Sequence, residues 1–465
     1  MEVEAGKRSR VGGCRKETNI QGRYARQFYA SSRKKKGLMR NGFEWNRFEA
    51  NREAAARAIF LKMTPRKWRL VRAFEGVLRL ILPMLPGRTF ETVAAQPKTI
   101  LVVEYWNLGD LAILVPFLRN LRAGFSRAKI SLLVNESLKT FLEGQRLVDE
   151  FIPVRVPWAQ HFSRWKKYNP FSVHWISFVR TIIGIRKRQF DWAISGRMDV
   201  RDNFLLWLSG AARRIGYGLG GGGFLLTDRV APDLSRPHRA DIWLHLLDAA
   251  GKQPNRGLSG FRLTRSELAS AEAFLRDRGI PAGAFLIGVH PGARIAVRRW
   301  GDEKFAEVAH HILRAKDAHI LWFSDPGIPS DAPRLERCHA VSLEFRSFLA
   351  VLSLCRLLIC NDSGPMHLAG LLGVPVVAVF GPQKPEWFGP RGALDRVVIQ
   401  PEFWCRPCFD YCIFGEPHCV RTITSGQVIA TVREAMQELR AEPSFTIGSY
   451  LAIATGEGRK NGGIS

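Results

Sequence analysis

One stretch, residues 357–382, constrains the fold of this chain more than any other. Residues 357–360 are a short apolar run of the kind that forms a buried parallel strand. A polar turn at residues 361–364 leads into an apolar helix with Pro365 in its first turn, where the missing N–H costs nothing. Residues 374–380 are a second apolar run, which predicts the next strand. Strand, turn, helix and strand in this order indicate an α/β fold with a parallel sheet.

The polar turn is also a candidate binding site. It places free backbone N–H groups at a helix N-terminus beyond the carboxyl end of a strand, where open α/β sheets bind ligands and phosphates are favoured. We expect the backbone of Ser363 and Gly364 and the ring of His367 to contact a phosphate. Asp362 would cap the helix or bond a sugar hydroxyl. The alternative is a turn with a capping Asp and a surface His, which a lone Asp-Ser-Gly would favour. Here a strand, a cap, a His and a second Gly-Pro loop coincide, which favours the binding site.

A second unit of this kind begins near residue 98. Residues 99–103 predict a strand, residues 111–123 a helix and residues 129–134 another strand, so the loop after the first strand lies at the ligand-binding edge. In that loop Gly109 lets a substrate approach the backbone, and Asp110 offers a carboxylate. The alternative role for Asp110 is that of a helix N-cap. A later glycine run, residues 218–223, lacks the features of a phosphate loop and is interpreted as a flexible loop.

Basic and glycine residues follow a third predicted strand, residues 285–290. Gly292 lies in a Pro-Gly loop that exposes backbone donors, and Arg298 supplies a fixed positive charge near them. This combination favours an anionic ligand such as a diphosphate.

Three of these stretches together resemble a known family. The run from Asn361 to Ala369, followed by Gly-Val-Pro at 373–375 and Phe-Gly-Pro at 380–382, is similar to the signature of glycosyltransferase family 9, the ADP-heptose:lipopolysaccharide heptosyltransferases and their relatives. The segment 107–110 resembles the Gly-Asp motif of that family, and Arg298, two positions before a Trp, resembles its phosphate-contacting basic residue. The resemblance covers roughly residues 98–440.

The resemblance implies a GT-B architecture, in which two doubly wound Rossmann-like domains face a cleft. It implies an inverting transfer of a heptose, or a similar sugar, from a nucleotide sugar such as ADP-heptose to a lipopolysaccharide core or lipid A-type acceptor, with no required cofactor. The implied catalytic base is Asp110. The residues implied to bind the nucleotide sugar are Gly109, Gly292, Arg298, Asp362, Ser363, Gly364 and His367.

Two features of the chain leave other functions open. Relatives often carry a Gly-Gly pair and a nucleoside-contacting Glu where this chain has residues 325–331, so a GT-B transferase with another nucleotide sugar and a non-lipid acceptor is the main alternative. A nucleic-acid-binding protein that uses the basic N-terminus is a remote alternative, because no nucleic-acid motif is present.

Residues 151–200 look irregular. Their Trp165, Lys166 and Lys167 are acceptor-site candidates or, alternatively, part of a surface helix with a buried aromatic side.

The formal net charge of +27 is concentrated at the front, where residues 1–98 hold 23 Lys and Arg against 8 Glu. This charge favours an anionic partner, either a nucleic acid, an anionic membrane surface or a phosphorylated glycolipid, and does not choose among them. The absence of a nucleic-acid motif argues against the first. The sequence shows no signal peptide and no long apolar run, so we expect a cytoplasmic protein that is peripheral on the inner face of the membrane. The sequence does not indicate an oligomeric state.

The predicted organisation has six parts. They are a disordered basic extension (1–64), a basic amphipathic helix on a membrane or docked on the neighbouring domain (65–90), an N-terminal acceptor-side domain (98–250), a linker (251–262), a C-terminal nucleotide-sugar-binding domain (263–445) and a loose tail (446–465).

Four cysteines cluster late in the chain, at Cys405, Cys408, Cys412 and Cys419. Four thiolates suit a structural zinc ion, but their spacing is not that of a common zinc motif. A structural segment without metal is the other interpretation. A cytosolic location argues against stable disulfides here.

Overall fold

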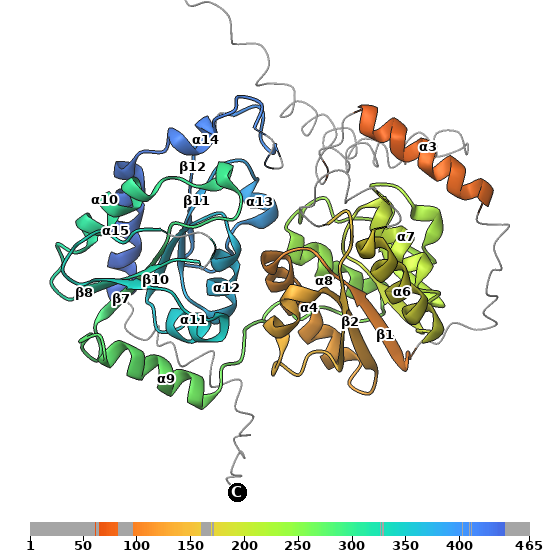
Figure 1. The fold of residues 1–465 in the computed structure, drawn as a ribbon, viewed down its shortest axis with the longest axis horizontal. Coiled ribbons are helices and arrows are strands. Elements are labelled where there is room, and N and C mark those ends of the chain that lie inside the picture. The colour runs from red at the N-terminus through yellow and green to blue at the C-terminus, as the bar shows by residue number, and fades with distance from the viewer. Residues whose placement is uncertain are drawn as a thin grey trace, which may run out of the picture. The chain divides into compact units, whose positions relative to one another are not determined.

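The structure is a computed structural model that describes residues 61, 65–81, 96–159, 169, 172–325, 327, 330–401, 403–408, 410 and 412–441. The predicted extension, residues 1–64, lies outside the described residues apart from Leu61, as do the tail after residue 445 and the acceptor candidates Trp165, Lys166 and Lys167. Within them the chain forms two six-stranded sheets in which every strand pairing is parallel (Figure 1). The predicted fold class, two doubly wound Rossmann-like domains, is therefore confirmed.

The first sheet has the strand order β3-β2-β1-β4-β5-β6. Its alternating side chains pack against helices on both faces, since Ile100 and Val102 face α4 and α8 while Leu101 and Val103 face α6 and α7. The bounds of these elements are β1 Thr99–Val103, α4 Leu108–Gly124, β2 Lys129–Asn135, η2 Glu136–Leu142, β3 Glu150–Val154, α6 Val173–Lys187, β4 Trp192–Ile194, α7 Val200–Leu208, β5 Arg213–Tyr217, η3 Gly223–Leu225, β6 Asp228–Val230 and α8 Arg239–Ala249.

The second sheet has the order β12-β11-β10-β7-β8-β9. One face packs on α11 and α12, and the other face packs on α10 and α15. The bounds of these elements are α9 Arg265–Arg276, β7 Phe285–His290, η4 Ala296–Arg298, α10 Asp302–Ile312, β8 Ala318–Phe323, β9 Cys338–Val341, α11 Phe345–Leu352, β10 Leu357–Asn361, α12 Gly364–Leu372, β11 Val376–Phe380, α13 Pro385–Phe388, β12 Arg396–Ile399, α14 His418–Arg421 and α15 Ser425–Ala441.

Both sheets have the same topology when each is counted from its own first strand. The order reverses between β1 and β4 in the first sheet, and between β7 and β10 in the second. Such a reversal separates the loops at the carboxyl ends of the two strands and creates the place where doubly wound sheets bind ligands. The loops after β1 and β4 lead to Asp110 and Arg197, and those after β7 and β10 lead to Arg298 and Asp362. The topology therefore makes these four residues candidates for ligand binding.

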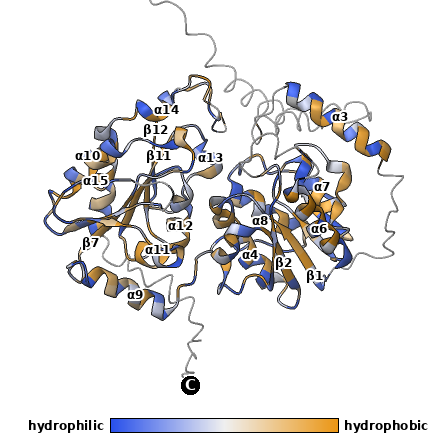
Figure 2. Cartoon of the chain, in the orientation of Figure 1, coloured by the Kyte–Doolittle hydropathy of each residue, from blue (hydrophilic) through white to orange (hydrophobic). Residues whose placement is uncertain are grey.

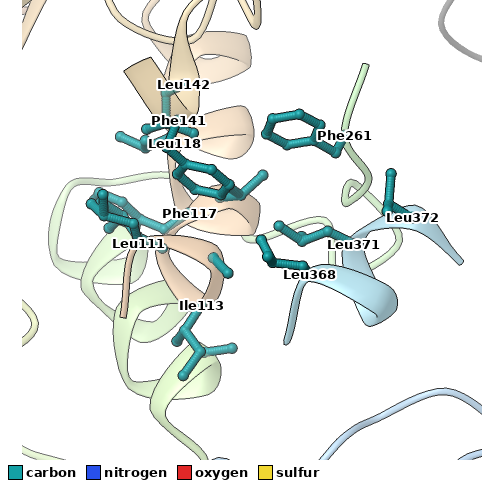
Figure 3. Close-up of a cluster of buried hydrophobic side chains, with 14 of the residues drawn as sticks. Leu111, Ile113, Phe117, Leu118, Phe141, Leu142, Phe261, Leu368, Leu371 and Leu372 are labelled. Atoms are coloured by element: carbon teal, nitrogen blue, oxygen red, sulfur yellow. The ribbon is translucent and has the colours of Figure 1, made fainter. Parts of the chain in front are cut away.

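The α4 and α8 layer of the first sheet and the α11 and α12 layer of the second sheet share one continuous core. Figure 3 shows Ile113 and Phe117 of α4 on the side of this core that faces Leu368 and Leu371 of α12, with Phe261 from the connecting segment above them. Full burial of each such side chain contributes roughly 1.5–3 kcal/mol. This apolar contact sets the N-terminus of α4 beside that of α12.

Two predictions about the first domain were wrong. The described part of residues 151–200 is not irregular, because α6 buries Phe178, Ile182 and Ile185 against the sheet, which agrees with the alternative of a surface helix with a buried aromatic side. The glycine run at 218–223 is a closely packed turn and not a flexible loop: a Cβ at Gly220 would lie 1.9 Å from the Met198 carbonyl oxygen. Its glycines serve close backbone packing.

The helix α3, Pro65–Ile81, matches the predicted amphipathic segment in its described part. It docks on the first domain through Leu78, which is buried, and Glu75, which accepts a 2.5 Å hydrogen bond from the Gly222 backbone N–H. An adjacent stripe, which contains most of the predicted apolar face, remains exposed at Leu70, Val77 and Ile81, and Phe74 at its margin packs edge-on against Phe204 of the first domain. Figure 2 shows apolar and polar residues alternating along α3, in contrast to the mainly apolar strands of the sheets.

Candidate active site

Asp110 lies in the first turn of α4. Asn107 is the N-cap of this helix, and Asp110 occupies the third helical position, where its Oδ2 accepts a 3.2 Å hydrogen bond from the Asn107 backbone N–H. Asp110 is therefore a capping-box carboxylate and not the N-cap that was the alternative from sequence. Its other oxygen, Oδ1, accepts a 3.0 Å bond from Nη1 of Arg197. The carboxylate is thus held from two sides at the carboxyl edge of the first sheet.

Arg197 was not singled out from the sequence. It follows β4, and its Nη1 lies 3.0 Å from Asp110 Oδ1 and 3.4 Å from Oε2 of Glu104, so one guanidinium group serves two carboxylates. The guanidinium also lies over the ring of Trp106, 4.7 Å from the ring centroid. Glu104 is fully buried, and burial raises the pKa of this carboxyl to about 8 against the opposing effect of Arg197. This pair of loops concentrates charge where the strand order reverses.

Arg298 is the centre of the second-sheet site. Its Nη1 lies 3.4 Å from Oδ2 of Asp362, which is buried at the end of β10. Burial raises the pKa of Asp362 to about 6, and Arg298 opposes that shift. Because Asp362 faces Arg298, its carboxylate does not cap α12 in this structure.

The N-terminus of α12 is built by an asparagine. The side chain of Asn361 donates to the Pro291 carbonyl over 2.6 Å and accepts from the Trp300 backbone N–H over 3.1 Å, which ties together the loops after β7 and β10. Ser363 is the N-cap of α12 but makes no side-chain capping bond, since its hydroxyl donates to the Asn361 carbonyl. The first N–H groups of a helix have no partner within the helix, so those at the start of α12 are available to an anion.

His367 contacts the first domain. A Cβ added at Gly109 would lie 3.0 Å from Cδ2 of His367, so the glycine permits the two helix ends to approach closely. Burial lowers the pKa of His367 to about 4, with Asp110 opposing and Arg298 reinforcing the shift. The ring is consequently neutral at pH 7, and it can offer one N–H to a ligand but no positive charge.

Gly292 occupies a similarly crowded place in the second domain. A Cβ there would lie 3.0 Å from Cε1 of His290 and 3.1 Å from Oδ2 of Asp325. His290 and Asp325 are paired, with Nε2 of the ring 3.4 Å from Oδ1 of the carboxylate. The structure therefore brings Asp110, Gly109, Arg298, Asp362, Ser363, Gly364 and His367 to the adjoining ends of α4 and α12, with Gly292 in the neighbouring loop.

The four clustered cysteines line one cavity together with Val297, Pro382 and His418. Burial raises the pKa of Cys419 to about 11, which disfavours its thiolate form. Among the residues that the structure describes, no three His, Cys, Asp or Glu side chains form a group arranged to hold a metal ion.

Comparison with known proteins identifies related sequences. The model of glycosyltransferase family 9 (heptosyltransferase) matches residues 178–416, just over half of the chain. The chain is similar to lipooligosaccharide heptosyltransferase 2 of Campylobacter jejuni, with 24% identity over 166 residues that cover 33% of this chain and 52% of that protein. It is also similar to lipopolysaccharide core heptosyltransferase OpsX of Haemophilus influenzae, with 20% identity over 317 residues that cover 65% and 84%. The match thus spans about half the length of the Campylobacter relative.

Solved structures show the same fold. A glycosyltransferase of family 9 from Veillonella parvula superposes with a TM-score of 0.59 and 23% identity, covering 76% of this chain and all of that one. The ADP-heptose lipopolysaccharide heptosyltransferase II of E. coli superposes with a TM-score of 0.54 and 17% identity, covering 74% and 99%.

Proposed function

Because this chain belongs to glycosyltransferase family 9, we propose that it is an inverting glycosyltransferase. It transfers a heptose from a nucleotide sugar, ADP-heptose, to a lipopolysaccharide core or lipid A-type acceptor. The sugar and the acceptor rest on the description of the family and on the names of the relatives. The reaction type rests on the arrangement of charged groups at the ends of α4 and α12.

One observation carries the proposal. Gly109 and Asp110 lie in the first turn of α4, and Gly109 abuts His367 of α12, since a Cβ there would lie 3.0 Å from Cδ2 of the ring; Arg298 lies 3.4 Å from Asp362, just before α12. A carboxylate thus faces a guanidinium group and a free helix N-terminus. That is the pairing needed by a reaction in which a base activates a nucleophile and an anion departs.

In the proposed mechanism, Asp110 accepts the proton of an acceptor hydroxyl while that oxygen attacks the anomeric carbon of the donor. The bond from the anomeric carbon to the diphosphate oxygen breaks, and the electron pair leaves with the nucleoside diphosphate. Attack from the face opposite the leaving group inverts the anomeric configuration. Arg197 orients the base, since its Nη1 donates to Oδ1 of Asp110 over 3.0 Å.

The second domain binds and stabilises the leaving group. Arg298 and the backbone N–H groups of Ser363 and Gly364 donate to the diphosphate oxygens and stabilise the charge that develops on them. His367 donates one N–H as a neutral ring. Asp362 acts indirectly, because its buried carboxylate is paired with Arg298 and holds that side chain in place.

We also propose that α3 brings the enzyme to the anionic inner leaflet, where a lipid-linked acceptor is found. None of the helices in the described part of the chain has the length and apolar character needed to cross a bilayer. The exposed stripe of α3 lies beside the exposed Arg66 and Arg69. An apolar stripe flanked by basic side chains suits a helix that lies in the surface of an anionic membrane.

We also propose that the cysteine cluster holds a structural zinc ion. No step of the mechanism uses this ion. The four thiols share a cavity, but they would have to draw closer to coordinate a metal. Metal analysis of the purified protein, with Cys408→Ser as the comparison, tests this. One zinc per chain that is lost in the variant supports the ion, and a metal-free stable protein removes it.

The function is tested by turnover with a panel of nucleotide sugars and a lipid A-core acceptor. We expect ADP-heptose to be used and Asp110→Asn to lower kcat by about 10²–10⁴-fold, the usual contribution of a general base. Glu267→Gln is the matched control, because Glu267 is the corresponding capping-box carboxylate of α9 and is paired with Arg346 over 2.6 Å. It should leave kcat unchanged. Full activity of Asp110→Asn would remove the proposed base, and turnover of a different nucleotide sugar would correct the donor.

A further inference from the structure

Two N–H donors of the Arg298 guanidinium, on Nε and Nη2, are already bound. Its Nε donates to Oδ1 of Asp410 over 2.7 Å, and its Nη2 donates to Oδ2 of the same residue over 2.8 Å. This is a two-point bond between a guanidinium group and a carboxylate, the geometry in which arginine also binds phosphates. Asp410 therefore occupies the donor pair that a diphosphate would use.

Asp410 comes from the cysteine cluster, between Cys408 and Cys412. The cluster is bonded to the loop after β11, because the Cys408 backbone N–H donates to the Pro382 carbonyl over 3.1 Å and Arg406 Nε donates to the Gly381 carbonyl over 2.7 Å. Asp410 itself has a φ of +69°, in the left-handed region that a non-glycine residue adopts at a conformational cost. The loop thus presents this carboxylate to Arg298 in an unfavourable backbone conformation.

Arg298 has another anchor that does not depend on Asp410. Asp362 is buried, it follows β10 directly, and its Oδ2 lies 3.4 Å from Nη1 of Arg298. A guanidinium held from behind by one carboxylate keeps its orientation when the other leaves. Asp410 is therefore not needed to position Arg298, and its charge would repel an incoming diphosphate.

We propose that Asp410 is an internal competitor for the diphosphate site, which the donor must displace from Arg298 before it binds. The inference rests on the proposed function and adds a regulatory element to the same site. When the donor binds, its diphosphate oxygens accept the two N–H groups that Asp410 releases. When the nucleoside diphosphate leaves, Asp410 returns to the guanidinium and keeps its charge paired.

The inference is tested by calorimetric titration of inorganic pyrophosphate and, separately, of ADP into the full chain. Asp410→Asn keeps the shape of the side chain and removes its charge, so we expect both ligands to bind about tenfold more tightly than to the wild type. Asp410→Glu keeps the charge and should bind them as weakly as the wild type. The matched control is Asp317→Asn, because Asp317 is paired with Arg440 over 2.8 Å just before β8, at the opposite edge of the same sheet. It should change neither affinity.

Weaker binding to Asp410→Asn would show that Asp410 positions Arg298, and unchanged binding would show that the two ligands do not meet it. Either result overturns the inference, as does a failure of pyrophosphate to bind both proteins. Thermal unfolding of each variant establishes that it is folded, and Asp410→Ser, which also removes the charge and should bind both ligands more tightly, decides the question should the asparagine variant be unstable. Measuring sugar transfer by the same proteins separates this inference from the proposed function. Tighter pyrophosphate binding without any sugar transfer supports the competitor and removes the transferase, whereas transfer without tighter binding does the reverse.

Discussion

At the scale of single residues, burial decides what His367 can contribute. The ring lies against Gly109, and burial lowers its pKa to about 4, so folding holds it in the neutral form that a leaving diphosphate can only meet as a hydrogen-bond donor. The positive charge of the site comes instead from Arg298, whose ion pairs with Asp362 and Asp410 keep it protonated at every accessible pH. Charge and hydrogen bonding are thus divided between two side chains.

The depressed pKa of His367 predicts a pH dependence of stability. Between about pH 6.5 and pH 4 the unfolded chain binds a proton at this residue and the folded chain does not, so the free energy of unfolding falls as the pH falls through that window. Above pH 6.5 both states are neutral and the effect is absent. His367→Asn should abolish this contribution, so the stability advantage of the wild type over the variant should shrink by about 1–3 kcal/mol between pH 7.5 and pH 4.5.

Urea unfolding of both proteins at a series of pH values measures this difference. The comparison with the variant is needed because the raised pKa values of Asp362 and Glu104 act in the opposite direction, and stability from those groups is lost as the pH rises. Both contributions largely cancel in the difference between the two proteins. A wild-type advantage that is constant or grows towards pH 4.5 would show that the pKa of His367 is not lowered in the folded state.

The sequence allowed only part of the site to be predicted. Asp110, Arg298, Ser363 and His367 each belong to a short motif beside a strand, so local patterns were sufficient to find them. Arg197 and Asp410 have no such pattern, because Arg197 lies 87 residues from Asp110 and Asp410 lies 112 residues from Arg298. Their roles follow from contacts that only the folded chain creates.

At the scale of elements, α3 has two different faces. Val71, Glu75 and Leu78 face the first domain, where a Cβ at Gly221 would lie 2.5 Å from Cγ1 of Val71. The adjacent stripe stays exposed, with Leu70 at 70% and Val77 at 52% of their surface accessible. The helix therefore docks on its domain and still presents an apolar surface, so the two alternatives drawn from its sequence are compatible.

We predict that the exposed stripe mediates membrane binding. Leu70→Ser combined with Ile81→Ser should weaken binding to phosphatidylglycerol-containing vesicles at least about tenfold, because each buried apolar side chain contributes roughly 1.5–3 kcal/mol. The melting temperature should not change, since both side chains are exposed. Vesicle co-sedimentation provides the measurement.

The control for this prediction is Ile413→Ser with Phe414→Ser, which removes two exposed apolar side chains from the second domain. This variant should bind vesicles as the wild type does. Equal losses in both variants would mean that any exposed apolar residue contributes and that α3 has no particular role.

The elements themselves were largely accessible from sequence. Buried parallel strands such as 99–103 and 285–290 are continuous apolar runs, and their predicted bounds agree with β1 and β7. The segment around α6 was misjudged because tryptophan and basic residues obscure its buried stripe of Phe178, Ile182 and Ile185. That stripe is periodic, but its partners are strands distant in sequence, so its burial could not be inferred locally.

At the scale of the whole molecule, two sheets of the same topology contribute different chemistry to one site. The reversal in the first sheet supplies a carboxylate, and the reversal in the second supplies a guanidinium group and a helix N-terminus. The shared core of α4 and α12 brings the two together. No sequence pattern specified this contact, because it depends on the apolar surfaces of helices from opposite halves of the chain.

The most direct test of this division of labour is the ADP affinity of three proteins, measured by calorimetry under identical conditions. The account predicts that Arg298→Gln weakens ADP binding about 10–100-fold, the worth of charge-assisted hydrogen bonds to a diphosphate. Asp110→Asn, with its lowered kcat, should bind ADP as the wild type does. Unchanged ADP binding in Arg298→Gln, or an equal loss in Asp110→Asn, would contradict the assignment of the leaving group to the second domain and of the base to the first.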